Sequence, residues 1–171
     1  MTLHRRAALA ALALAAALTA TLALAQGKKD SATIGMVLEP PGLDPTIAPS
    51  AAIGQIVHYN TFEGLTKINA DGAITPLLAE SWTMDPDGKS YTFKLRKGVK
   101  FQDGAAFDSS AVKFSFERAK DPKSTNKAKG AVFDNISSIS APDPHTAILT
   151  LNNADGNFLF RMGENLSLIH I

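Results

Sequence analysis

The strongest constraint on the fold of this chain is the turn sequence DPDG at residues 85–88, which lies between two segments suited to strands. Proline presets φ for such a turn, and glycine takes positive φ without steric cost. Residues 90–96 (SYTFKLR) then alternate between apolar and polar side chains, the apolar ones being Tyr91, Phe93 and Leu95. This period of two predicts a half-buried strand, paired with residues 81–84 in an antiparallel hairpin.

Further strands are predicted where β-branched or alternating residues are bounded by turn residues. These segments are residues 33–38, 65–69, 99–101, 135–140 and 146–151. Residues 70–72 turn the second of them, and the last two form a hairpin across residues 141–144.

Two helices have start signals, and residues 157–162 begin a third. Ser50 is placed to cap a helix that ends near Asn60, and Asp108 to cap one that Asp121-Pro122 closes. Apolar residues at spacings of three and four give each helix one buried face: Ile53, Ile56 and Val57 in the first, Val112, Phe116 and Ala119 in the second.

The first 25 residues are predicted to be a secretory signal peptide. A short basic start with Arg5 and Arg6 precedes an uncharged run of Ala and Leu that ends in Ala23-Leu24-Ala25. The run is near the length of a membrane anchor, but its alanine content and the A-x-A site favour cleavage after Ala25. Residues 26–171 then form the mature part, for which we expect no stable membrane insertion.

Composition excludes several classes of protein. The signal segment holds two of the 17 basic residues and none of the 16 acidic ones, so the mature part has a net charge of −1 and no nucleic-acid footprint. The chain has no cysteine, and therefore no disulfide and no lipid attachment at the cleavage site. We expect a soluble periplasmic protein stabilised by its core.

No catalytic, metal or cofactor site is predicted. The four histidines have no metal-ligand spacing, and no nucleophile elbow or nucleotide-binding loop occurs. Asp85, Asp87 and Asp103 each stand beside Pro or Gly, so turn formation accounts for them better than acid–base catalysis. Trp82, Phe93 and Phe101 are expected to pack in the core.

Residues 78–118 resemble the signature region of the family 5 extracellular solute-binding proteins, which bind dipeptides, oligopeptides or nickel for ABC importers. The matching elements, in order, are AESW at 79–82, DG at 87–88, YTF at 91–93, LRKGVKF at 95–101, DG at 103–104 and VKFS at 112–115. The LDP at 43–45, the YNTFEGL at 59–65 and residues 143–151 extend the likeness over nearly all of the mature chain. One departure is Ala111, where the family usually has Asp.

The resemblance implies an α/β protein with a periplasmic-binding-protein type II-like fold, in which two lobes close on a ligand. Relatives are several times longer, so this chain would supply part of the first lobe. We expect a truncated chain whose last few residues, within the apolar run 165–171, are foreign to the natural protein. The implied partners are a small-molecule or peptide ligand and the membrane permease subunits, with the binding protein itself a monomer.

The resemblance also implies a ligand-binding segment just after the LDP motif, at Ala48, Pro49, Ser50, Ala51 and Ala52. Backbone groups there could pair with an extended peptide, and small side chains allow close approach. An ordinary capping loop is the alternative.

For the whole protein the alternatives are a fragment of a secreted hydrolase and an envelope structural or adhesion domain. The ligand stays open among dipeptides, oligopeptides, glutathione, haem-like compounds, nickel chelates and sugars.

Overall fold

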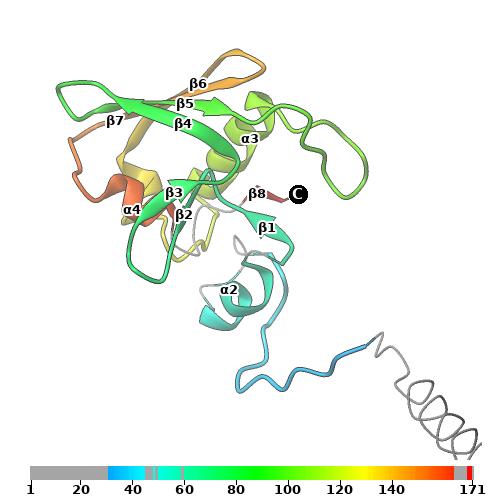
Figure 1. Cartoon of the computed structure of the whole chain (residues 1–171). Helices are drawn as coiled ribbons and strands as arrows, with labels where there is room; N and C mark the ends of the chain where they lie inside the picture. Colours follow the sequence, from blue (N-terminus) through cyan, green and yellow to red (C-terminus); the bar gives the residue numbers. More distant parts are fainter. Residues whose placement is uncertain (1–30, 45–47, 49, 59, 164–168, 171) are drawn as a thin grey trace, which may run out of the picture. The chain divides into compact units, whose positions relative to one another are not determined.

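The computed structural model describes residues 31–44, 48, 50–58, 60–163 and 169–170 (Figure 1). The predicted signal peptide 1–25, and most of the apolar run 165–171, lie outside the described residues. The chain divides into two units, Met1–Val37 and Leu38–Ile171, and everything below concerns the second unit unless stated otherwise.

A four-stranded antiparallel sheet with the order β4-β5-β7-β6 forms the centre of the second unit. Its strands are β4 (Ala79–Met84), β5 (Ser90–Leu95), β6 (Ile136–Asp143) and β7 (Thr146–Leu151). Both predicted hairpins are confirmed: Trp82 lies opposite Phe93 in β4–β5, and β6 pairs with β7. The hairpins join through β5 and β7, where Phe93 lies opposite Ala147.

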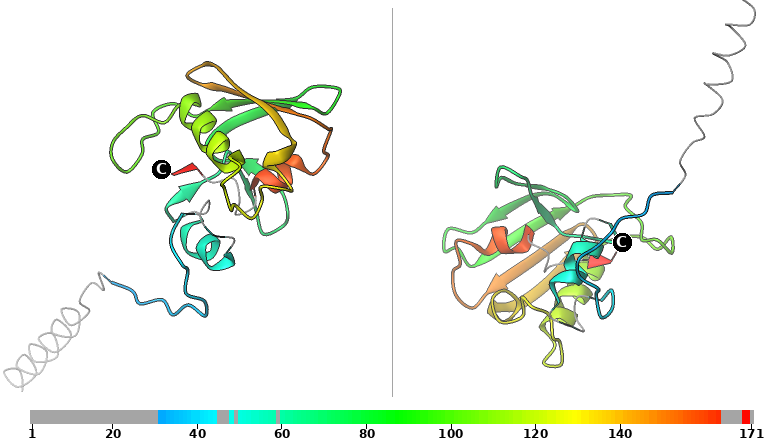
Figure 2. Two further views of the ribbon diagram at one scale, coloured as in Figure 1. Left: turned by 180° about the vertical axis from the view of Figure 1, so that it is seen from behind. Right: turned by 90° about the horizontal axis from the view of Figure 1, so that it is seen from below.

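Two helices, α3 (Ser109–Lys120) and α4 (Phe158–Gly163), lie on the same side of this sheet (Figures 1 and 2). The side chains that β5 points toward them are buried, as the alternation predicted: Tyr91, Phe93 and Leu95. Lys94, on the other face, is exposed. The Tyr91 ring packs on Phe158 with a centroid distance of 4.8 Å. Burying one such aromatic side chain contributes about 1.5–3 kcal/mol.

Helix α3 begins as predicted. Asp108 has extended backbone angles, and its carboxylate accepts hydrogen bonds from the N–H groups of Ser110 (2.8 Å) and Ala111 (3.3 Å). The predicted stripe of Val112, Phe116 and Ala119 is buried, and Phe116 meets Phe133 of the short 3-10 helix η1 (Phe133–Asn135) edge to face at 5.6 Å. The side-chain cap and the buried stripe therefore both stabilise a helix at the predicted position.

Two small strand pairs complete the unit. β2 (Thr66–Ile68) pairs with β3 (Ile74–Pro76) across a turn in which Gly72 has φ of 83°. β1 (Phe62–Glu63) pairs with β8 (Ile169–His170), which lies more than a hundred residues away in sequence. The remaining helix, α2 (Ala51–Val57), precedes β1.

Two predicted strands are wrong. Residues 33–38 form no strand, because no segment among the described residues pairs with them; Val37 is 99% exposed and Ile34 79%. Residues 99–101 are held in a tight loop, in which Lys100 forms a single bridge with Ala106 and the Phe101 N–H donates to the Ala105 carbonyl (2.9 Å). Such a loop is too short for a ladder.

Three predicted boundaries also move. Helix α2 ends at Val57 rather than near Asn60, because His58 takes extended backbone angles. Strand β6 runs to Asp143, through residues that we assigned to the turn, by accommodating a register shift between Ser140 and Asp143. Helix α4 runs to Gly163, one residue beyond the predicted segment.

Candidate functional site

The candidate ligand segment lies at the start of α2, and the structure describes four of its five residues. Pro49 lies outside the described residues. Ala48 and Ser50 are half-buried, Ala51 is exposed, and Ala52 is 2% exposed. Ala52, including its backbone, is therefore packed inside the protein, which leaves Ala48, Ser50 and Ala51 as the described residues of the segment that are open to solvent.

Ser50 occupies the predicted N-cap position with extended backbone angles, φ −102° and ψ 125°. Its carbonyl accepts a hydrogen bond from the Ile53 N–H (3.2 Å), but its hydroxyl makes no capping bond. The predicted position is confirmed, whereas the side-chain cap is absent. The helix is held instead by burial of Ile53 and Val57, which are 1% and 0% exposed.

The segment is tied to the rest of the unit by side chains distant in sequence. Arg118 of α3 forms an ion pair with Asp44, which belongs to the LDP motif just before the candidate segment. After α2, the Gln102 side-chain amide donates to the Thr61 carbonyl (3.2 Å). Neither the ion pair nor this hydrogen bond was predicted from the sequence. Arg118 lies at the end of the matching block and off the buried stripe of α3. This position was the signal that could have indicated the ion pair with Asp44.

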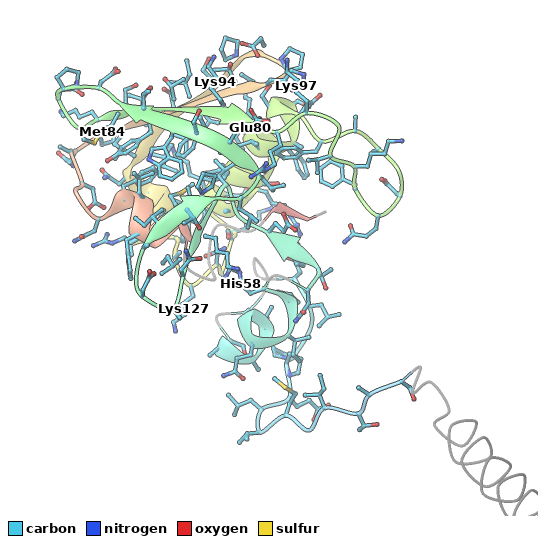
Figure 3. The ribbon with its side chains drawn as sticks, in the orientation of Figure 1. His58, Glu80, Met84, Lys94, Lys97 and Lys127 are labelled. Atoms are coloured by element: carbon cyan, nitrogen blue, oxygen red, sulfur yellow. The ribbon has the colours of Figure 1, made fainter. Side chains whose placement is uncertain are left out.

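The pKa values of His58, Asp108 and Asp143 are shifted by their surroundings. Burial, and secondly the nearby charge of Lys67, lowers the pKa of His58, which follows α2 (Figure 3). At the start of α3, the Ser110 hydroxyl and backbone hydrogen bonds lower the pKa of Asp108. The backbone N–H of His145 does the same for the pKa of Asp143.

Asp85, Asp87 and Asp103 lie in turns, as predicted. Asp87 accepts the Lys89 N–H (2.9 Å), Asp103 accepts the Ala105 N–H (2.8 Å), and the Asp85 carbonyl accepts the Gly88 N–H (2.9 Å).

Within the described ranges, His, Asp and Glu side chains form no group of three that could hold a metal ion. No helix in the described part of the chain is long and apolar enough to cross a bilayer.

The aromatic residues of the matching block pack as predicted. Phe93 is fully buried in the main apolar cluster, and Trp82 and Phe101 pack against that cluster while partly exposed. They therefore support the sheet and α3. The segment at residues 48–52, which small residues and backbone dominate, remains the candidate site.

Solved structures with this fold are periplasmic binding proteins. AgaA in complex with agropinic acid (A. tumefaciens R10) is 35% identical, with a TM-score of 0.70, over 77% of this chain and 26% of that one. DppA from Helicobacter pylori, described as an ABC transporter-associated periplasmic binding protein in complex with the peptide STSA, is 31% identical with a TM-score of 0.65, over 74% and 28%. The predicted fold class, an α/β part of a type II periplasmic-binding-protein fold, is confirmed.

The family model for bacterial extracellular solute-binding proteins, family 5 middle, matches residues 73–170, and the chain belongs to this family. The glutathione-binding protein GsiB of Escherichia coli K12 is 36% identical over 154 residues, which are 90% of this chain and 29% of GsiB. The chain thus spans less than a third of the length of these curated relatives. Members of the family are transport binding proteins rather than enzymes.

Proposed function

We propose that this chain is the N-terminal part of a periplasmic solute-binding protein that captures a short peptide or peptide-like ligand and delivers it to the permease of an ABC importer. The observation that carries the proposal is the 36% identity to GsiB over 90% of the chain. Glutathione is itself a modified tripeptide, and the bound ligand of DppA is a tetrapeptide. These two relatives support a peptide-like ligand, whereas AgaA is in complex with agropinic acid and NikZ from Campylobacter jejuni, 30% identical with a TM-score of 0.65, is in complex with Ni(L-His).

The candidate segment suits a peptide main chain. Ala48, Ser50 and Ala51 carry small side chains at the start of α2, so a ligand backbone can come close. Backbone N–H and C=O groups pair with a peptide irrespective of its side chains, which gives affinity without strict sequence preference. We include Pro49 in the proposed site as a further backbone position, and Ala52, which is 2% exposed, as the buried residue on which the segment rests.

The proposed working protein is longer than this chain. Family members clamp a ligand between two lobes, and a ligand closes such a clamp through its higher affinity for the closed state. Because the chain spans 29% of GsiB, residues 26–171 would form part of the first lobe. We expect the 171-residue chain alone to bind peptides no more tightly than about the micromolar range, since half of the enclosing surface is missing.

Export is part of the same proposal. The protein would enter the periplasm with residues 1–25 removed, and act there as a soluble monomer. N-terminal sequencing of the periplasmic form should give Gln26 as the first residue. A mature protein that retains residues 1–25 in the membrane fraction would overturn the cleavage.

The binding function is tested on the full-length protein. Native mass spectrometry of the protein as purified should show a bound mass in the range of a short peptide. Titration calorimetry should then give saturable binding of glutathione or of di- to tetrapeptides, with the ligand recovered unchanged. Hydrolysis of the ligand would instead support the hydrolase alternative. Small-angle scattering that shows no compaction upon ligand addition would support an envelope structural role.

A further inference from the structure

One aromatic side chain of α3 faces away from the core. The buried stripe of this helix runs through Val112, Phe116 and Ala119. Phe114 stands two residues from Val112 and two from Phe116, and a helix turns about 100° per residue, so its ring lies on the opposite side. The ring is 67% exposed. A helix that covers a sheet usually has polar and charged residues on its outward face, so Phe114 departs from the usual pattern.

The charged residues beside Phe114 are paired within the protein. Lys113 and Glu117 of the same helix form an ion pair at 3.8 Å, and Arg118 pairs with Asp44. These two bases and two acids add no net charge to the outward face of α3. Covering this face would therefore leave none of these four charges without its partner in the interior, and a buried charge without a partner is far more costly than a buried pair.

A second apolar side chain stands beside one of these ion pairs. Leu43 precedes Asp44 in the sequence and is 55% exposed. Phe114 precedes Arg118 by one helical turn, so the two are neighbours on the surface of the helix. Leu43 and Phe114 thus flank the ion pair of Arg118 and Asp44 from two different segments. We call the surface formed by these four residues the α3 surface.

The size of the α3 surface indicates what can cover it. An aromatic ring buries about 150–250 Å², whereas a stable complex of two separate proteins buries about 1,200–2,000 Å². One ring and one leucine are therefore too small to offset the freedom that a second chain loses on association. A segment of the same polypeptide is held nearby by its covalent connection and needs no such area. The chain spans 29% of GsiB, so most of a protein of that length lies outside it and can supply the segment.

We propose that the α3 surface is an internal docking site: in the full-length protein, an uncharged apolar segment from the part that follows the stretch described here covers Phe114. The inference rests on the proposed function in one respect, namely that this chain is the N-terminal part of a longer protein, and it does not depend on the ligand. Covering the ring removes apolar surface from water and so stabilises the contact between the two parts. In the 171-residue chain the ring stays exposed.

Thiol labelling of the full-length protein tests the burial of Phe114. Phe114→Cys should react with a maleimide at least about tenfold more slowly in the folded protein than in urea, because labelling waits for the covering segment to open. Thr83→Cys is the matched control. Trp82 packs against the core, so the exposed Thr83 beside it points to the other face of the sheet, away from α3. Its labelling should change by less than about twofold.

Peptide mass spectrometry reads each labelled position separately from any natural cysteine elsewhere in the protein. Hydroxyl-radical footprinting of the Phe114 ring in the unsubstituted protein repeats the measurement if Phe114→Cys folds poorly. The ring should be oxidised at least about tenfold more slowly in the folded protein than in urea.

Cross-linking identifies the segment that covers the ring. Benzoylphenylalanine incorporated in place of Phe114 should link to a peptide from the later part of the same polypeptide, and the product should migrate as a monomer. The proposal is overturned if Phe114→Cys labels as readily as Thr83→Cys, or if the cross-link joins two copies of the protein. If the protein binds no peptide while Phe114 is protected and cross-linked as expected, the proposed function fails and the docking site stands. If it binds peptide while Phe114 is freely labelled, only the docking site fails.

Discussion

The sheet region, residues 65–163, and the segment at residues 38–61 that precedes it are stabilised in different ways. The sheet region has one continuous apolar cluster in which Phe93, Phe116 and Leu149 are at most 1% exposed. The preceding segment has a seven-residue helix whose buried Ile53 and Val57 lie outside that cluster. It is tied to the sheet region by Arg118 and Gln102 side chains. The candidate site thus lies in the segment outside the main apolar cluster, and binding segments are commonly found in such regions.

The largest expected effect is on the sheet region. Phe116→Ala removes a buried ring that packs on Phe133, and we expect a loss of about 3–5 kcal/mol in the free energy of unfolding. Urea denaturation followed by the fluorescence of Trp82, the single tryptophan, measures it. Phe114→Ala on the same helix is the control: this ring is 67% exposed, so the change should stay within about 0.5 kcal/mol. Equal effects would contradict the described core.

The second prediction separates the two regions directly. Ile53→Ala should reduce local protection of residues 51–57 in hydrogen exchange by about 2–5 kcal/mol, because a buried side chain of α2 is truncated. The urea midpoint reported by Trp82 should not move. Gln55→Ala, an exposed position on the same helix, should change neither quantity. If Ile53→Ala shifts the Trp82 midpoint as far as Phe116→Ala does, the two regions unfold as one cooperative unit and the comparison fails.

A third prediction concerns the packing of α4 on β2. A Cβ at Gly163 would approach Cγ1 of Ile68 to 2.7 Å and the Ile68 backbone nitrogen to 3.3 Å. Gly163→Ala should therefore cost about 1–3 kcal/mol through overpacking. Gly156→Ala is the matched control, since nothing lies within 4 Å of its added Cβ. Thermal unfolding of both variants measures this cost in stability. An unchanged thermal midpoint for Gly163→Ala would show that α4 can shift.

The smallest expected effect is at the start of α3. Asp108→Ala removes a cap with two backbone hydrogen bonds and should cost about 1 kcal/mol, whereas Asp108→Ser keeps an acceptor and should cost less. Because the pKa of Asp108 is lower in the folded than in the unfolded chain, its charge stabilises the fold above the ordinary value of about 3.9. That contribution is lost as the pH falls through the lower, folded pKa.

Chemical denaturation between pH 7 and pH 2.5 measures this last effect. The stability difference between the wild type and Asp108→Ala should be constant near neutral pH and shrink below about pH 4. A difference that grows on acidification would mean that the carboxyl group is stabilised in its protonated form, contrary to the hydrogen bonds it accepts from Ser110 and Ala111.

Several features of the fold could be predicted because they depend on neighbouring residues. The turn at residues 85–88 and the alternation of Tyr91, Phe93 and Leu95 specify a hairpin and its buried face through local sterics and a period of two. Asp108 and the stripe through Phe116 specify α3 in the same way. The candidate site was placed by family resemblance, and the residues from Ala48 to Ser50 have no periodic pattern that indicates binding.

By itself, the sequence determined the hairpins, the capped helix α3 and the family, since each depends on residues close together along the chain or on a motif with fixed spacing. The tertiary structure decided what needs a distant partner. Pairing of β5 with β7, of β1 with β8, and of Arg118 with Asp44 depends on which surfaces meet after folding, and local patterns do not encode that choice. For the same reason residues 33–38 have strand-like composition but form no strand: a strand exists only where a neighbour completes its hydrogen bonds.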